Sequence, residues 1–431
     1  MQKIEDLVER YPHNDAILET AASIYLDQNE IKKTRASIEQ LKQMTGPTPK
    51  VMEMESSLLI QERRWDEAFV VIEKLHARNP EDPQTTVNYA YVAMKARKWT
   101  EAIKTYKELI ERGEENQDWR SSYRLAQEQG APSLGGSFSY FIRPQKQRDY
   151  IFKEQGRFWL KDWLQLTALV SEEFYQQDSE SGAEALEEWV DTHSLEGKVF
   201  LNEALSMSTR WDTFYSQGLV LHGGALAAEY EIEKVDVYSS YRFNQLVREP
   251  IAAISKEGRM DQVKLGTRVN FLERWQAGQE TTIQWYHVDD GANTLNGEED
   301  LGHKLIYDLY TQYRIFKKPY LVVNYHFKRG HWDKKFNGAE SVIDFLSDEQ
   351  VHSPGFYFEH NLNRHLTWHM GGSYGLDTKR NIDYVFWSLG HDLWITDDVK
   401  FSVSYDVAQG DSGVSGSGDT QAINGAMNIY F

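Results

Sequence analysis

The sequence ends on QAINGAMNIYF (Gln421–Phe431), where an apolar residue or a glycine occupies every second position. Side chains alternate between the two faces of a β-strand, so one face carries Ile423, Gly425, Met427, Ile429 and Phe431. The opposite face carries Asn424, Asn428 and Tyr430. This pattern predicts a strand with lipid on one side and water on the other. A sheet in lipid must close on itself, because each unpaired backbone group there costs several kcal/mol.

The same alternation extends upstream to about Ser133. In FSVSYDVA (401–408) and YLVVNYHFK (320–328), apolar side chains share one face and mostly polar ones share the other. The connections alternate in length, as they do between the two ends of a transmembrane barrel. Short ones lie at 363–364, 317–319, 396–398 and near Glu233, and long ones at 247–260, from Asp289, at 329–354 and from Gln409.

Counting these connections predicts an all-β transmembrane barrel of about 16 antiparallel strands over residues 133–431. The strands before Arg210 have the weakest alternation, and GAEALEEWV from Gly182 also fits a helix. A soluble β-sandwich would alternate in the same way. The alternation of connection lengths and the terminal strand favour the barrel. No window contains the roughly 20 consecutive apolar residues of a spanning helix.

The N-terminal third has a different period. RRWDEAFVVIEKL (63–75) and RKWTEAIKTYKEL (97–109) align at a spacing of 34 residues, the tetratricopeptide (TPR) period. The spacing pairs Trp65 with Trp99 and Ala68 with Ala102 as packing positions. It predicts an all-α TPR solenoid over residues 1–130, whereas a helical bundle would match several positions at one period only by coincidence. TPR stacks are docking surfaces without chemistry of their own.

Upstream repeats carry the register back to the first residues. Ile4 and Leu7 precede Ile72 and Leu75 by 68 residues, so we expect the chain to open on the second helix of a repeat. The repeats are then the C-terminal part of a longer array. The first ten residues contain no apolar core of a signal peptide, and such a signal would lie further upstream.

Charge indicates what the barrel interior attracts. The chain carries a net charge of −19, and residues 133–431 contain 28 Lys and Arg against 43 Asp and Glu. This balance argues against nucleic acid as a partner. In LAAEYEIE (226–233) the apolar positions would face lipid and the acidic ones the lumen. The lumen and translocation candidates on this reasoning are Glu229, Glu231, Glu233, Asp308 and Asp406. An acidic lumen would attract cationic cargo, although loop carboxylates also contribute to the excess.

The sequence gives little support for a metal site or a catalytic site. The chain has no cysteine, so it offers no thiolate metal site, and it lacks a G-x-S-x-G nucleophile motif. We therefore expect no enzyme activity, no catalytic residues, no cofactor and no metal. Aromatic residues make up 13% of the chain. We expect Trp368, Trp387 and Trp394 in interfacial girdles, with stacking on sugar rings as the alternative.

With both parts in view, the chain resembles the exopolysaccharide export porins of Gram-negative bacteria. In these proteins a periplasmic TPR array runs into a C-terminal barrel of about 16 strands. The resemblance rests on the 34-residue repeats and on the final strand, which is similar to the C-terminal signal of outer-membrane proteins, with Met427, Ile429 and Phe431 in the apolar positions. It is strongest to the C-terminal part of the Pel exporters, with the poly-N-acetylglucosamine exporters next. Cellulose is neutral and alginate is anionic, so the acid excess favours an amino-sugar polymer.

The resemblance also implies partners. It implies an outer-membrane location with the TPR part in the periplasm, insertion into the lipid bilayer by the barrel assembly machinery, and a polysaccharide substrate. It further implies a periplasmic lipoprotein ring (PelC-like) and a polymer-modifying enzyme (PelA-like) that docks on the repeats. Two alternatives share this architecture: a TPR–barrel translocator of surface lipoproteins and a passive porin.

Overall fold

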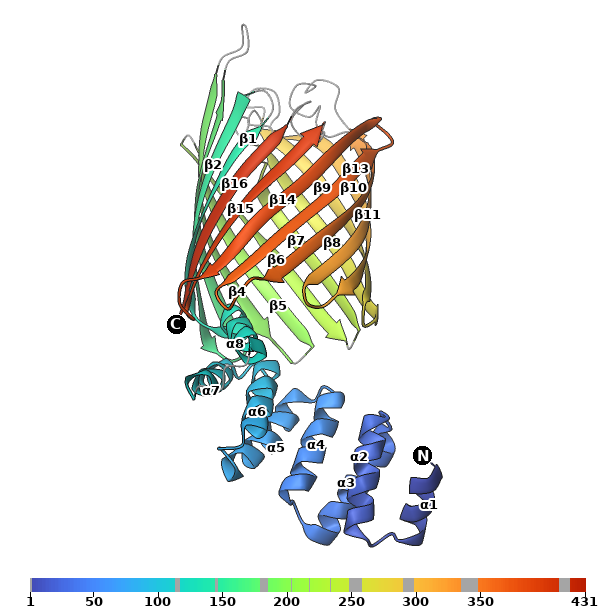
Figure 1. The fold of residues 1–431 in the computed structure, drawn as a ribbon. Coiled ribbons are helices and arrows are strands. Elements are labelled where there is room, and N and C mark those ends of the chain that lie inside the picture. The colour runs from blue at the N-terminus through green and yellow to red at the C-terminus, as the bar shows by residue number, and fades with distance from the viewer. Residues whose placement is uncertain are drawn as a thin grey trace. The chain divides into compact units, whose positions relative to one another are not determined.

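The chain divides into two units, residues 1–131 and 132–431. The computed structural model describes residues 2–112, 117–143, 146–178, 185–202, 204–216, 218–232, 234–247, 258–289, 298–334, 348–410 and 419–431 (Figure 1). The first unit is helical and the second is a β-barrel, as the sequence predicts.

The described part of the first unit contains eight helices, which pack in antiparallel succession. They are α1 (Gln2–Arg10), α2 (Asp15–Asp27), α3 (Ile31–Thr45), α4 (Pro49–Gln61), α5 (Trp65–Arg78), α6 (Pro83–Lys95), α7 (Trp99–Glu111) and α8 (Gln117–Gly130). None of the helices in the described ranges is long and apolar enough to cross a membrane.

The 34-residue period also governs how the helices begin. Asn14, Thr48 and Asp82 precede α2, α4 and α6, and the side chain of each accepts a hydrogen bond from the backbone N–H three residues later, at 3.1, 3.3 and 3.0 Å. These bonds satisfy donors that a helix N-terminus leaves unpaired. The same period recurs in the turns between paired helices, where Asn29, Arg63 and Arg97 have φ of 58°, 56° and 58°.

Small residues let the paired helices approach closely. Ala68 on α5 and Ala102 on α7 are fully buried in one core cluster. Trp65 and Trp99, the first residues of the same helices, pack against that cluster. A larger side chain at either alanine would overpack the interface, at a cost of about 1–3 kcal/mol.

The cap at Asp82 provides a local test of the repeat. Hydrogen bonds from Thr85 lower the pKa of the Asp82 carboxyl, so the capping form persists until the pH falls towards that lowered pKa. We expect Asp82→Ala to destabilise α6 by about 1 kcal/mol. Hydrogen exchange of α6 amides in the full chain measures this as faster local opening. Gln84→Ala in the first turn is the control, and equal exchange in the two variants would contradict the capping role.

The second unit contains sixteen strands among its described residues. They are β1 (Ser133–Arg143), β2 (Gln147–Lys161), β3 (Leu164–Gln177), β4 (Leu186–Phe200), β5 (Leu205–Ser216), β6 (Leu219–Ile232), β7 (Val235–Leu246), β8 (Arg259–Leu272), β9 (Trp275–Asp289), β10 (Glu298–Phe316), β11 (Tyr320–Lys334), β12 (Glu349–Asn361), β13 (Leu366–Asp377), β14 (Ile382–Trp394), β15 (Val399–Gly410) and β16 (Thr420–Tyr430). Each pairs antiparallel with its sequence neighbours, and β1 pairs with β16 to close the barrel.

Closure runs along the whole of the final strand. Ser133 lies opposite Tyr430 and Ile142 opposite Gln421 in the β1–β16 register. The Phe431 N–H donates to the carbonyl of Pro132 at 2.9 Å, beyond the last paired residue. Figure 1 shows β1, β2, β15 and β16 side by side on one wall of the barrel. No sheet edge is left open among these strands, which meets the hydrogen-bonding demand of a lipid environment.

The structure decides against one local alternative and corrects one local expectation. The helical interpretation of GAEALEEWV fails for its described part, because Leu186–Val190 begins β4, while 182–184 lie outside the described residues. The expected long connection 329–354 is shorter, since β11 continues to Lys334 and β12 begins at Glu349. Cross-strand pairing extends both strands through residues whose local sequence resembles a loop.

Candidate functional site in the barrel lumen

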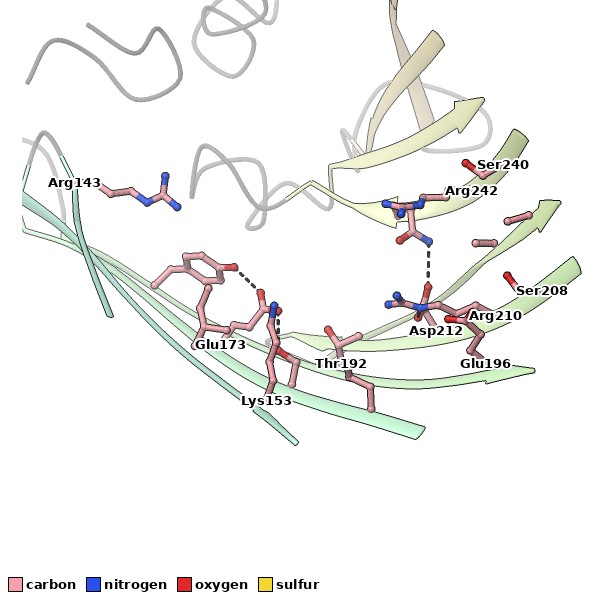
Figure 2. Close-up of a pocket in the computed structure, with 17 residues that line it drawn as sticks. Arg143, Lys153, Glu173, Thr192, Glu196, Ser208, Arg210, Asp212, Ser240 and Arg242 are labelled. Atoms are coloured by element: carbon pink, nitrogen blue, oxygen red, sulfur yellow. Dashed lines mark hydrogen bonds and ion pairs between the residues drawn. The ribbon is translucent and has the colours of Figure 1, made fainter. Parts of the chain in front are cut away.

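A cavity of about 510 Å³ identifies the lumen-facing side of the strands. It is lined from β1 to β7, and Figure 2 shows its charged and polar side chains. On β6 it is lined by Ala225 and Ala227. Because side chains alternate along a strand, the odd-numbered residues of β6 face the lumen and Leu226, Tyr230 and Ile232 face outward. These three are 54%, 43% and 48% exposed.

Glu229 and Glu231 lie on the same face of β6 as Ala225 and Ala227, two and four residues further along the strand. The Glu229 side chain is 53% exposed and pairs with Lys198 at 3.4 Å. Glu231 is exposed and lies opposite Asp236 in the β6–β7 register. Glu233 lies outside the described residues. The two described glutamates are adjacent to the short turn between β6 and β7, near one mouth of the barrel.

The two predicted aspartates have different surroundings. Asp308 on β10 lies 2.7 Å from Nε2 of His326 on β11. Asp406 on β15 accepts a hydrogen bond from Nδ2 of Asn424 at 2.7 Å. Through the strand registers, both occupy the face that is continuous with the cavity lining. A role for these carboxylates in translocation stays a prediction.

The carboxylates that line the cavity are held by neighbours. Glu173 accepts hydrogen bonds from the hydroxyls of Ser171, at 2.9 Å, and of Tyr175. Asp212 is 1% exposed and pairs with Nε of Arg210 at 2.6 Å, while Ser194 donates to it at the same distance. A buried carboxylate needs such partners to stay charged.

A second set of contacts lies on the wall formed by β7 to β10. The Tyr238 hydroxyl donates to Glu280 at 2.8 Å, and Lys264 pairs with the same carboxylate at 2.8 Å. Arg268 donates to the Tyr310 hydroxyl at 3.2 Å and lies 3.6 Å from Asp236. The lumen wall therefore carries interleaved acids and bases rather than acids alone.

Three tyrosines on the lumen face cover glycines on the neighbouring strand. Tyr238 lies over Gly266, Tyr310 over Gly278 and Tyr384 over Gly375, each pair directly opposite in register. A Cβ at Gly266 would come within 2.1 Å of the Tyr238 ring, and at the other two glycines within 2.4 Å and 2.1 Å of the covering ring. The absence of a side chain lets each ring lie against the wall.

Filling one of these positions should narrow the channel. We expect Gly266→Val to displace the Tyr238 ring into the lumen, lower the single-channel conductance and destabilise the barrel by about 1–3 kcal/mol. Gly371→Val is the matched control on the lumen face of β13, because the nearest atom to a Cβ there is the Phe356 carbonyl oxygen at 3.4 Å, an ordinary contact. Equal conductance in the two variants, at the wild-type value, would show that the ring does not bound the open lumen.

Sequence reasoning missed the lumen-facing cations and one aromatic. The alternation that places Glu229 in the lumen also places Lys153, Arg210 and Arg242 there. Trp394 was expected in a girdle. It is 5% exposed, stacks on Tyr430 and lies on the lumen face of β14.

Trp368 and Trp387 lie on the opposite, outward face of their strands, and Trp387 is 40% exposed. The outward placement is compatible with a position in the interfacial girdles, which stays a prediction for Trp368 and Trp387.

Comparisons with known proteins support this architecture. A tetratricopeptide repeat family matches residues 59–125. No curated protein matches the sequence. Among solved structures, a "bacterial polysaccharide outer membrane secretin" aligns with a TM-score of 0.53 and 14% identity, over 70% of this chain and 98% of its own.

Two further barrels align at lower scores. OmpTdeltaL8, an outer membrane protein of Vibrio cholerae, has a TM-score of 0.37 and 13% identity, over 70% of this chain and 97% of its own. The CymD monoaromatic hydrocarbon channel has a TM-score of 0.36 and 11% identity, over 72% and 91%.

The fold and the lumen together define a class: a closed sixteen-stranded outer-membrane barrel preceded by tetratricopeptide repeats. The fold of its barrel is similar to that of the solved structure described as a bacterial polysaccharide outer membrane secretin.

Proposed function

We propose that the chain is an outer-membrane channel that exports an exopolysaccharide to the biofilm matrix, in the manner of the Pel exporter PelB. The observation that carries this is the direct passage of the repeats into a closed barrel, whose fold is similar to that of the polysaccharide secretin. The repeats would lie in the periplasm. There they would dock a PelC-like lipoprotein ring and a PelA-like polymer-modifying enzyme.

The proposed cargo is a cationic, partly deacetylated amino-sugar polymer. Glu229 and Glu231 support it, because both are exposed near one mouth and, within the described ranges, no Lys or Arg forms an ion pair with Glu231. An ammonium group at that mouth would gain attraction that a neutral sugar would not. A poly-N-acetylglucosamine exporter is the neighbouring choice, since its polymer can also carry free amines.

Secretion of labelled amino-sugar polymer from cells that lack the gene tests the function. We expect polymer to accumulate inside these cells and to reappear outside when the full gene is restored. Polymer that still appears outside would end the export proposal. A surface-lipoprotein translocator would instead leave polymer secretion intact and strip lipoproteins from the surface, and a passive porin would change only small-solute uptake.

A further inference from the structure

We propose that the lumen cavity between β1 and β7 is a subsite for a carboxylate-bearing saccharide. The ligand is a free sugar acid, because the amino-sugar polymer proposed above carries amines and no carboxylate. The inference rests on the proposed channel function, because the ligand reaches the cavity through the lumen. It differs from that function in naming an anionic group as the ligand, on a chain of net charge −19.

Several charged side chains of the cavity are already paired within the protein. Four cations line the cavity, together with three carboxylates. Glu173 and Asp212 have their oxygens engaged by protein donors, as described above. Arg210 is committed to Asp212, and Arg143 pairs with Asp149, which is fully buried. These groups contribute little free charge to a ligand.

Two cations of the cavity lining are not paired within the described part of the protein. Lys153 on β2 and Arg242 on β7 line the cavity, and both are exposed to it. Within the described ranges, neither has a carboxylate at ion-pair distance. Figure 2 shows them on separate sides of the cavity. Among the described lining residues, Glu196 is the one carboxylate without a hydrogen-bond donor, so the free charge is two cations against one acid.

The side chains and the volume of the cavity indicate the shape of the ligand. Arg242 presents a planar guanidinium that matches a carboxylate, with two parallel hydrogen bonds. The hydroxyls of Ser208 and Ser240 also line the cavity and suit sugar hydroxyls. A cavity of about 510 Å³ falls within the range of small-molecule sites, which favours a saccharide over a simple inorganic anion.

The experiment uses the full chain in planar bilayers, with trigalacturonate as the probe. We expect reversible current blocks, which weaken about tenfold or more in Lys153→Gln/Arg242→Gln, as the loss of charge-assisted hydrogen bonds predicts. Blocking should also weaken as salt is raised. The matched control is Lys264→Gln/Arg268→Gln. It removes the same charge from the lumen face at cations that pair with Glu280 and Asp236.

Comparison of charged and neutral sugars, and of the two double variants, distinguishes the possible results. Block by both trigalacturonate and monomeric galacturonate supports the free sugar acid, and block by trigalacturonate alone would contradict it. Equal block by neutral maltotriose, equal loss in the control variant, or no block at all would overturn the subsite. Failure here leaves the secretion assay unaffected, so the subsite and the export function are tested separately.

Discussion

Replacing Ile423 with arginine should lower barrel stability in lipid by up to about 2–4 kcal/mol, the cost that Arg or Lys on a barrel's lipid face reaches at the bilayer midplane. Ile423 is 49% exposed on the outward face of β16, opposite Tyr140 of β1 and Tyr405 of β15. Denaturant titration of the chain folded into vesicles measures the loss, and the heat-dependent gel shift of barrels reports the folded fraction.

The neighbouring residue supplies the control. Asn424 faces the lumen beside Asp406, so an arginine there would gain a carboxylate partner and water. We expect Asn424→Arg to unfold close to the wild-type denaturant concentration. Equal losses in the two variants, or a larger loss for Asn424→Arg, would show that the inside and outside of β16 have been assigned in reverse.

Reversing the charge of Glu229 and Glu231 should change what the channel passes. The double variant Glu229→Lys/Glu231→Lys replaces two negative charges with two positive ones on the lumen face near one mouth, a net change of about four charge units. The field in a narrow low-dielectric channel acts strongly on permeating ions. We expect the reversal potential in a salt gradient to shift towards anion selectivity, and export of the amino-sugar polymer to fall.

Two graded variants check the sign of this effect. Glu229→Gln/Glu231→Gln should shift selectivity in the same direction by less. Lys198→Gln should shift it towards cations, because it removes the partner that lies 3.4 Å from Glu229. Unchanged selectivity in the double lysine variant would remove the two glutamates from the translocation path.

Local patterns predicted the elements well where one period dominates. The 34-residue spacing located the helix pairs, and it also governs the caps at Asn14, Thr48 and Asp82, which sequence reasoning did not use. β4 is among the weakest of the predicted strands, because polar and apolar residues mix on both its faces. Val190 faces the lumen, while Asp191 and His193 face outward.

The lumen was harder to predict than the fold, because its properties depend on register between distant residues. Counting acidic residues does not show which of them have partners. Asp308 has one, because Nε2 of His326 on the next strand lies 2.7 Å from its carboxylate. No local pattern shows that Gly266 lies under Tyr238, 28 residues earlier in the sequence. A search for lumen-facing lysines and arginines by the same parity would have found Lys153 and Arg242.

The most direct test of the central claim is to watch polymer pass through the single channel. Partly deacetylated amino-sugar oligomers of graded length would be driven by voltage through the full chain in a planar bilayer. The export account predicts blocks whose duration grows with oligomer length and shortens as the driving voltage rises, because the chain threads through and leaves on the far side. Blocks that lengthen with voltage, with no oligomer recovered in the opposite chamber, would mean that the barrel captures the polymer without exporting it.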